Sequence, residues 1–456
     1  MQINIAGAGA GKTTTMADTI VKLRDGTDKS KNIFCITFTN NAVSCIEQKL
    51  QNYYGIIPHN IVVSTIHSFL YREFIKPYYF LLFGKQYERI SIAPLPQKPI
   101  YKKAKIKMLE ERNILHQEVI PERAKWVIAK KSDDRKAVRD TREIIINVFK
   151  EYCGGICIDE AQDVDSDTQL IIETLNESGI PLILMGDPKQ DIKGHKCLKS
   201  LVEKYKDSVN YIGVCRRCPQ KQLLISNSIV NNQEQQYSDK GGGLITIWFE
   251  KDKPCCELLN EEDFDLCYIS QKHGKYETHS TEATNSIFVA LSEEIESEMR
   301  RLHPDKTELV LLRASYYYAE LLLENYAVSN DKIKSMSETF KYETLSKKSY
   351  GVIINMISDN SVTLDGKKVL VNSIDSIKGQ EGGDCLFILT TDLAAYLFGE
   401  KTADTTTKNR LYVALTRSLD KLTIFITEEV ETKYKRENIV DFFEKISNAQ
   451  AIIAKN

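Results

Sequence analysis

The first segment that could do chemistry is a glycine-rich turn between an apolar run and a helical pattern. Met1–Ala6 is typical of a strand, Gly7–Lys12 of a tight turn, and Thr13 opens an amphipathic helix. Glycines let successive backbone N–H groups point at phosphate oxygens, and a helix N-terminus adds partial positive charge. The spacing predicts that Lys12 reaches the β- and γ-phosphates of a nucleotide while Thr13 binds magnesium. A glycine turn with an incidental lysine is the alternative.

A second segment places two carboxylates at the end of a buried strand. The apolar run Ile156–Ile158 is followed directly by Asp159 and Glu160. Ligands lie at the carboxyl ends of strands in open parallel sheets, so both side chains should face the phosphates. Asp159 would hold the metal, and Glu160 would accept a proton from the attacking water. Alone, the same residues could be acids favoured at a helix N-terminus.

A third polar segment follows the strand predicted at 181–185. It contains Asp187, Pro188 and Gln190. A glutamine at a strand end can sense the γ-phosphate and couple hydrolysis to movement. A plain Asp-Pro turn would place the same residues there without that role.

The elements that must position these residues alternate along the chain. Short apolar runs alternate with helical patterns, which is typical of parallel sheets covered by helices. Strands are predicted at 32–37, 155–158, 181–185, 308–312, 368–373 and 385–390. A Lys- and Glu-rich stretch between Phe83 and Tyr152 has helical periodicity and predicts an insertion. The polar run Asn231–Gly243 predicts an exposed loop.

Length and composition limit the possible classes of protein. A chain of 456 residues is too long for one ordinary core, and 42% hydrophobic with 27% charged residues is typical of a folded protein. The net charge of −2 gives no general attraction for phosphates, so nucleic acid would need local basic patches. The sequence has no signal-like start, no apolar run that could cross a bilayer and no metal-ligand cysteine spacing. We therefore expect a cytoplasmic protein without a membrane partner.

The motifs and their order resemble those of UvrD/Rep-type superfamily 1 DNA helicases. The matching segments beyond the phosphate loop (AGAGAGKT) are FCITFTNNAVSCI at 34–46, TIHSF at 65–69, DEAQD at 159–163, GDPKQ at 186–190, RCP at 217–219, SIDSIKGQE at 373–381 and RLYVALTR at 410–417. The resemblance implies an α/β fold with two RecA-like P-loop NTPase domains that bind ATP and Mg²⁺ between them. It also implies 3′–5′ movement along single-stranded DNA.

The resemblance assigns a role to individual residues. Arg217 and Arg417 would reach the γ-phosphate when the cleft closes, although alone either would suggest a surface ion pair. The residues expected to bind nucleotide are Ala8, Gly9, Ala10, Gly11, Lys12, Thr13, Thr14, Gly379 and Glu381, the last at the ribose. The residues expected to bind DNA are Thr37, Phe38, Thr39, Asn40, His67, Phe69, Lys193 and His195. Phe38 and Phe69 could equally be core residues.

Four features depart from the family pattern. The family reads adenine with a glutamine upstream of the phosphate loop, whereas this sequence begins at the strand, so we expect dATP and GTP to be hydrolysed too. The stretch Asp191–Lys196 lacks the base-stacking aromatic residues, each worth about 1–3 kcal/mol, so processive unwinding should be impaired. Asp375 replaces a histidine and Gly382 an aromatic residue, which predicts altered coupling between DNA and nucleotide.

The predicted domain plan follows from the order of these segments. The first RecA-like domain comprises 1–82 and 153–210, with a helical insertion at 83–152. The second comprises 211–456, with an accessory insertion reduced to about 327–366. Lysines of the helical insertion, such as Lys102 and Lys130, could bind duplex phosphates, although interleaved acids are equally typical of a solvated face.

Two functions remain open at this point. The compact size and the GDPKQ and RCP motifs resemble the helicase-like subunit of Gabija-type antiphage systems, which implies a protein partner of the OLD-family nuclease type. The chain would then be a DNA-dependent motor, or else a DNA-end-sensing switch that activates its partner without unwinding. A nucleotide-binding pseudoenzyme is disfavoured, because every catalytic residue type is present.

Overall fold

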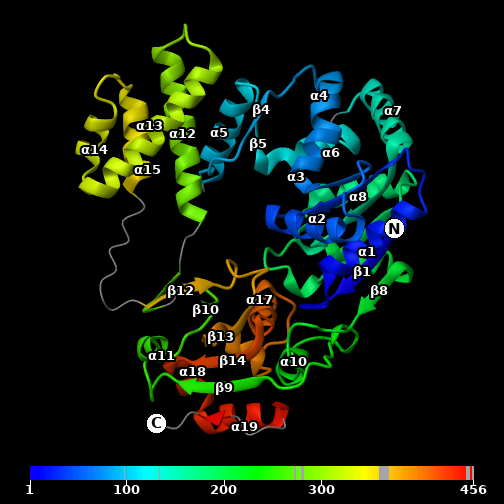
Figure 1. Cartoon of the computed structure of the whole chain (residues 1–456), viewed down its shortest axis with the longest axis vertical. Helices are drawn as coiled ribbons and strands as arrows, with labels where there is room; N and C mark the ends of the chain where they lie inside the picture. The colour runs from blue at the N-terminus through cyan, green and yellow to red at the C-terminus, as the bar shows by residue number, and fades with distance from the viewer. Residues whose placement is uncertain are drawn as a thin grey trace. The chain divides into compact units, whose positions relative to one another are not determined.

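The chain folds into two compact units, each built from segments far apart in the sequence (Figure 1). The computed structural model describes residues 1–96, 98–132, 134–271, 274–278, 282–358, 369–447 and 452–453. Unit 1 comprises Met1–Gly84, Ile120–His279 and Val369–Asn456. Unit 2 comprises Lys85–Val119 and Ser280–Lys368.

Unit 1 contains a first sheet of six parallel strands in the order β3-β2-β6-β7-β1-β8. Its strands are β1 (Gln2–Ala6), β2 (Asn32–Thr37), β3 (Ile61–Thr65), β6 (Cys153–Ile158), β7 (Leu182–Gly186) and β8 (Val209–Ile212). Parallel neighbours need long crossovers, and the alternation of apolar runs with helical patterns supplies them. Because β7 pairs with both β1 and β6, the carboxyl ends of these three strands lie side by side. The strands predicted in this part of the chain are confirmed.

Helices pack around this first sheet. They are α1 (Lys12–Asp25), α2 (Asn40–Tyr54), α3 (Ile66–Leu70), the π-helical η1 (Tyr71–Ile75), α4 (Lys76–Phe83), α6 (Ile120–Ile128), α7 (Lys136–Tyr152), α8 (Ser166–Glu177) and α9 (Cys197–Lys204). Helix α1 buries Met16 and Ile20 against Ile33 and Cys35 of β2. Each large aliphatic side chain buried in this way contributes about 1.5–3 kcal/mol. This packing fixes the start of α1 at the end of β1.

Unit 1 also contains a second parallel sheet, in the order β11-β12-β10-β13-β14-β9-β15. Its strands are β9 (Leu244–Phe249), β10 (Leu266–Ile269), β11 (Tyr276–Thr278), β12 (Val369–Ser373), β13 (Gly382–Leu389), β14 (Ser418–Ile426) and β15 (Ile452–Ile453). Its helices are α10 (Gln220–Asn227), α11 (Cys255–Glu261), α16 (Thr391–Leu397), α17 (Thr406–Leu415), α18 (Glu428–Tyr434) and α19 (Arg436–Ser447). The buried runs 385–389 and 422–426 form the centre of the sheet. The strands predicted near 368–373 and 385–390 are therefore confirmed, with residue 368 outside the described residues.

Unit 2 joins two insertions into one body. The first contributes β4 (Arg89–Ser91), α5 (Pro99–Glu111), β5 (Ile114–His116) and the short η2 (Gln117–Val119), and the second contributes α12 (Glu282–Leu302), α13 (Glu308–Ser329), α14 (Lys332–Thr339) and α15 (Lys347–Ser358). Arg89 Nη1 donates to both carboxylate oxygens of Glu296 at 2.8 and 2.9 Å. Ser91 Oγ donates to Glu293 at 2.6 Å. These bonds tie β4 to α12.

Several sequence predictions about the insertions are wrong. Residues 308–312 begin helix α13 instead of forming a strand, because a short apolar run without turn residues does not distinguish the two. The second insertion is not reduced to about 327–366, because it already includes α12. It has its own hydrophobic core, which includes Leu291, Ile295 and Leu322. Residues 359–366 lie outside the described residues. Of the insertion predicted at 83–152, α6 and α7 belong to unit 1, where Phe149 stacks on Phe34 of the first sheet.

Glu298 on α12 holds the turn that precedes α15. Its carboxylate accepts the backbone N–H of Ser346 at 2.8 Å and the hydroxyls of Ser346 and Ser349 at 3.0 and 3.1 Å. Arg301 Nη2 donates to it at 2.9 Å. Burial opposes ionisation, yet these donors lower the pKa of Glu298 to about 2. The carboxylate is therefore ionised at neutral pH.

We expect Glu298→Gln to lower the free energy of unfolding at pH 7 by about 1–3 kcal/mol, because buried donors lose their charged acceptor. The folded pKa lies below the ordinary value of 4.5, so this stabilisation is complete above pH 4.5 and is lost as pH falls toward 2. Thermal unfolding of both proteins at pH 7 and pH 3 tests this, with the exposed Glu338→Gln as the matched control. A difference in Tm that is as large at pH 3 as at pH 7 would contradict the assignment.

Candidate functional site

The turn after β1 has the backbone conformation of a phosphate cradle. Gly9 and Gly11 have φ angles of 68° and 74°, in the left-handed region that favours glycine. Helix α1 begins directly afterwards and has no acidic residue in its first turn. Its N-terminal partial positive charge is therefore available to an anion.

Gly9 is also required by its surroundings. A Cβ at this position would lie 2.3 Å from Cβ of Arg217 and 3.1 Å from that residue's backbone nitrogen. We expect Gly9→Ala to weaken nucleotide binding by about tenfold or more, since the loop must shift and a strained residue costs about 1–3 kcal/mol. Titration of a fluorescent ATP analogue measures the change. Gly55→Ala is the matched control, because Gly55 also has a positive φ, 74° against 68° at Gly9, but has nothing within 4 Å of its Cβ position. Equal losses in both variants would refute a local clash.

Asp159 follows β6 as predicted and lies buried next to a second carboxylate, that of Glu160, with Lys12 as the nearby positive charge. Its side chain is 1% exposed, and its Oδ1 accepts the backbone N–H of Glu160 at 2.9 Å. Burial and the charge of Glu160 raise the pKa of Asp159. A divalent cation would neutralise this carboxylate. Mg²⁺ needs only one or two protein oxygens beside substrate phosphates, so Asp159 and Thr13 fit it, although the described residues contain no cluster of three or more His, Cys, Asp or Glu that could hold a metal ion.

Glu160 is held in a strained conformation beside Lys12. Its φ is 53°, a left-handed conformation that costs a non-glycine residue about 1–3 kcal/mol and is common at functional sites. Its Oε2 lies 3.7 Å from Lys12 Nζ and accepts a hydrogen bond from Gln162 Nε2. Although burial opposes ionisation, Lys12 and Gln162 hold the pKa of Glu160 below its usual value. The carboxylate is thus ionised and able to accept a proton.

A pocket of about 430 Å³ lies at the phosphate loop within unit 1. It is lined by Ala8, Gly9, Ala10, Gly11, Lys12, Thr13, Thr14, Lys49, Glu160, Gln190, Arg216, Arg217, Gly379, Glu381, Arg417 and Leu419. All the residues predicted to bind the nucleotide or to act in catalysis line it, and of the predicted metal ligands only Asp159 is not in its lining. The structure therefore brings together residues separated by more than 400 positions in the sequence.

Two arginines approach this pocket from the connections of the second sheet. Arg217 Nε donates to Glu381 Oε2 at 2.6 Å. Arg417 is 1% exposed, and its guanidinium donates to the carbonyls of Val413 and Gln380 at 2.9 and 3.2 Å. Burial and the neighbouring Arg217 charge lower the pKa of Arg417 to about 10. An anion between the two guanidinium groups would relieve their repulsion.

Some residues at the site were missed by sequence reasoning. Lys49 on α2 donates from Nζ to Thr14 Oγ1 at 2.8 Å, and no spacing in the sequence signals it because the contact arises from packing of α2 near α1. Lys378 lies in the segment SIDSIKGQE, and its Nζ donates to both carboxylate oxygens of Asp163 at 2.7 and 2.8 Å. This ion pair links the segment after β12 to the segment after β6. It therefore joins parts of unit 1 that belong to different sheets.

Two of the residues predicted to bind DNA do not expose their side chains. Phe69 is 2% exposed and its ring packs 5.2 Å from that of Phe34 and 5.5 Å from that of Phe74, so it is a core residue, as the alternative held. Thr37 is fully buried, and its hydroxyl has no hydrogen-bond partner among the described residues. The predictions that the side chains of Phe69 and Thr37 contact DNA are therefore wrong. Strand β2 and helix α3 point these two side chains into the protein core.

The other predicted DNA contacts are accessible in whole or in part. Asn40, Lys193 and His195 are exposed, and Phe38 and His67 are half-buried. Thr39 is exposed but its hydroxyl caps α2 by accepting the N–H of Ala42 at 3.2 Å. Burial lowers the pKa of His67, with the charge of Lys193 adding to this shift and that of Asp165 opposing it. The segments that follow β2, β3 and β7 thus supply the candidate DNA contacts at the carboxyl edge of the first sheet.

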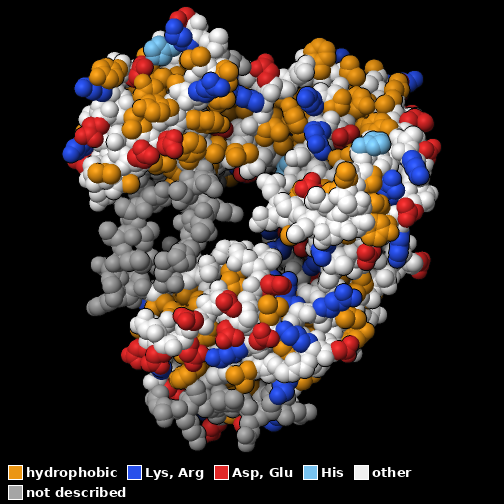
Figure 2. Space-filling view, in the orientation of Figure 1, with side chains coloured by type: hydrophobic (Ala, Val, Ile, Leu, Met, Phe, Trp, Pro, Cys, Tyr) orange, Lys and Arg blue, Asp and Glu red, His pale blue; other side chains and the backbone are white. Residues whose placement is uncertain are grey.

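The wider surface carries no single-sign field. Figure 2 shows basic and acidic side chains interspersed over the visible face, and the net charge of the chain is −2. Within the described part of the chain, no helix has the length and apolarity to span a membrane. Attraction of a polyanion must therefore depend on local groups.

The fold and the pocket define an α/β P-loop protein with parallel sheets. Residues 1–196 match a family model described as an AAA domain. Gabija protein GajB of Bacillus cereus is 32% identical over 191 residues, which are 41% of this chain and 36% of that protein. The ATP-dependent DNA helicase PcrA of Staphylococcus epidermidis is 28% identical over 188 residues, which are 38% of this chain and 24% of that protein. The chain resembles UvrD-type superfamily 1 helicases and, among them, GajB.

These matches have limited extent. They span about a third of GajB and about a quarter of PcrA. Among solved structures, the arterivirus nonstructural protein 10 helicase with DNA aligns with 94% of this chain and 62% of that chain, at 10% identity and a TM-score of 0.38. That likeness is too weak to support an argument.

Proposed function

We propose that the chain is a Mg²⁺-dependent ATPase of the UvrD type that acts on single-stranded DNA, its two parallel sheets being RecA-like domains. The pocket carries this proposal. Lys12 and Glu160 follow strands of the first sheet, whereas Glu381 directly precedes β13 and Arg417 directly precedes β14 of the second sheet. Such a division lets opening and closing of the cleft accompany hydrolysis.

The geometry suggests how the residues share the chemistry. Lys12 binds the β- and γ-phosphates, and Glu160 accepts the proton of the attacking water. Thr13 and Asp159 would hold Mg²⁺, which would neutralise charge at the phosphates. Arg217 leaves Glu381 to reach the transferred phosphoryl group, where Arg417 already lies close by. Gln190 is 4% exposed and donates to Asp187 at 2.9 Å, which orients its amide toward the pocket.

DNA is assigned to the surface formed by Phe38, Thr39, Asn40, His67, Lys193 and His195. Polar and basic groups there would bind phosphates, with Phe38 and His67 near the bases. Following the resemblance, movement is 3′–5′ along one strand.

ATP turnover by the purified chain tests the proposal. Turnover is measured alone and with single-stranded, blunt and tailed DNA, in the presence of Mg²⁺ and after its removal by chelation. Stimulation by DNA that requires Mg²⁺ is the expected result. Turnover that is indifferent to every nucleic acid would refute DNA as the ligand.

A second candidate, a DNA-sensing subunit that activates a nuclease partner in antiphage defence, is favoured by two observations. The loop Asp191–Lys196 contains no aromatic residue that could separate bases. Helix α13 exposes apolar side chains at positions spaced by seven, with Leu309, Val310, Tyr316 and Tyr317 being 57, 49, 48 and 61% exposed. Such a stripe on one helix face is typical of a docking surface, here for an OLD-family nuclease.

A strand-displacement assay on tailed duplexes separates the two candidates. Unwinding at a rate near that of ATP turnover supports the motor. DNA-stimulated turnover without displacement supports the sensor.

A further inference from the structure

Tyr412 on α17 fixes the phosphate loop from the second sheet. The backbone N–H of Ala8 donates to Tyr412 Oη at 3.1 Å, and the tyrosine hydroxyl donates to Gln236 Oε1 at 2.8 Å. Gln236 Nε2 in turn donates to the carbonyl of Ala8 at 3.0 Å. Tyr412 and Gln236 are 2 and 4% exposed, and a Cβ on Gly7 would lie 2.2 Å from the Gln236 side chain. The loop therefore cannot move without moving Tyr412.

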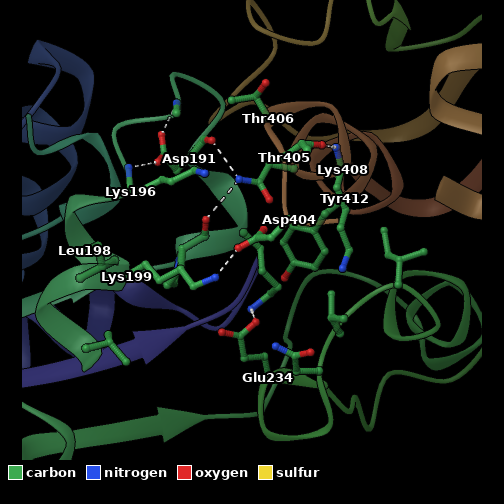
Figure 3. Close-up of a pocket in the computed structure, with 18 of the residues that line it drawn as sticks. Asp191, Lys196, Leu198, Lys199, Glu234, Asp404, Thr405, Thr406, Lys408 and Tyr412 are labelled. Carbon is green, nitrogen blue, oxygen red and sulfur yellow. Dashed lines mark hydrogen bonds and ion pairs between the residues drawn. The ribbon is translucent and has the colours of Figure 1, made fainter. Parts of the chain in front are cut away.

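Asn409 lies one turn earlier on α17 and contacts a different segment. Its Nδ2 donates to the carbonyl of Asp191 at 2.9 Å and to that of Pro188 at 3.4 Å. The neighbouring Thr406 packs so closely that a Cβ on Gly194 would lie 2.9 Å from its methyl group. Figure 3 shows Asp191, Thr406 and Tyr412 around one pocket. The start of α17 is thus seated on the loop that carries Lys193 and His195.

Hydrogen bonds to one buried carboxylate close the loop itself. The carboxylate of Asp191 accepts the backbone N–H groups of Gly194, His195 and Lys196 at 2.7, 3.2 and 2.7 Å (Figure 3). Asp191 is 5% exposed. A displacement of the exposed side chains of this loop therefore also displaces Asp191, whose carbonyl accepts the hydrogen bond from Asn409.

A buried charge cluster fills the space between the two contacts. Lys189 Nζ lies 2.9 Å from Asp187 and 3.6 Å from Glu234, and 5.1 Å from the centre of the Tyr412 ring. Asp187 also accepts from Gln190, which lines the nucleotide pocket. The positions of Tyr412 and of Gln190 are consequently linked through one lysine.

We propose that α17 couples the nucleotide pocket to the loop Asp191–Lys196, with Asn409 and Tyr412 as positioning residues. The helix has ten residues, about 15 Å of rigid rod. It carries the loop contact at its start, the phosphate-loop contact in its middle and Arg417 two residues past its end. A shift of the 191–196 loop on ligand binding therefore displaces Tyr412 and Arg417 together. The identity of the ligand as DNA rests on the proposed function. The coupling itself rests only on the contacts of α17.

The first test compares DNA stimulation of ATP turnover in variants of α17. Asn409→Ala is expected to keep basal turnover within about twofold of wild type while reducing the fold stimulation by DNA about fivefold or more, within the range of measured couplings. Asn409→Asp keeps the size of the side chain but places a carboxylate, which can only accept, against two carbonyl oxygens. This variant should reduce the fold stimulation by DNA further. Tyr412→Phe should also reduce it. Asn438→Ala, exposed on α19, and Tyr434→Phe, half-buried on α18, are matched controls outside the nucleotide pocket.

The second test needs no DNA. Amide hydrogen exchange across 188–196 is measured with and without a non-hydrolysable ATP analogue. Wild type and both controls should gain protection there, and the three α17 variants should lose that gain while retaining the wild-type Tm within a few degrees. Absence of a nucleotide effect in wild type, or a full effect in every variant, would overturn the coupling. If the nucleotide protects 188–196 in wild type but not in the α17 variants, while no nucleic acid stimulates ATP turnover, the coupling stands and the proposed function is refuted.

Discussion

Glu160→Gln should lower kcat for ATP hydrolysis by about 10²–10⁴-fold, the usual worth of a general base. Glutamine preserves the size of the side chain and can keep the backbone at φ 53°, but it accepts no proton at neutral pH. Nucleotide affinity should remain within about threefold, because Lys12 and the phosphate loop are unchanged. Steady-state turnover and equilibrium titration of an ATP analogue give the two quantities separately.

Two controls sharpen this experiment. Glu177→Gln, at the exposed end of α8, should leave both quantities unchanged. Asp159→Asn should raise the Mg²⁺ concentration needed for half-maximal turnover, which Glu160→Gln should not. A kcat within threefold of wild type in Glu160→Gln would mean that another group receives the proton.

Arg217→Ala should lower kcat by about 10³–10⁵-fold if Arg217 acts as an arginine finger. The guanidinium interacts with charge that develops in the transition state, so the loss should appear in kcat more than in the affinity for ATP. Arg217→Lys should recover little, because an ammonium cannot reproduce the planar fork. Single-turnover hydrolysis with enzyme in excess isolates the chemical step.

The ion pair with Glu381 offers an internal check. Arg217 is bound to Glu381 at 2.6 Å and must leave it to reach a phosphate. Glu381→Gln should therefore weaken nucleotide binding, through the lost ribose contact, while leaving the chemical step largely intact. Arg313→Ala, exposed on α13 of unit 2, is the neutral control. Equal kcat values for wild type and Arg217→Ala would remove Arg217 from the mechanism.

The local part of the site could be predicted from the sequence because short-range rules decide it. The turn Gly7–Lys12 needs positive φ angles that glycine supplies, and Asp159 follows a strand whose apolar run is unambiguous. The strands at 32–37 and 181–185 were found for the same reason. What these segments have in common is that their structure depends on neighbours within a few residues.

The rest depended on contacts that no local pattern encodes. The resemblance of TIHSF assigned Phe69 to DNA, with a core position as the alternative, and the ring contacts with Phe34 and Phe74 explain its burial. Tyr412 lies in the segment RLYVALTR and was given no role from the sequence, although its hydroxyl accepts a hydrogen bond from Ala8, 404 positions away. The run at 308–312 fits a strand or a helix equally well, and the core of unit 2 decides between them.

The composite construction of unit 2 also has a consequence for the order in which the protein is made. Arg89 and Glu296 are 207 positions apart, so at roughly 5–20 residues per second the ribosome finishes β4 about 10–40 s before its partner helix. During that interval Arg89 and Ser91 lack the carboxylates of Glu296 and Glu293 that bind them in the finished protein. The first insertion therefore matures last among the N-terminal segments. A nascent chain stalled before residue 280 should be cut by protease within 85–119 while its phosphate-loop sheet is already resistant.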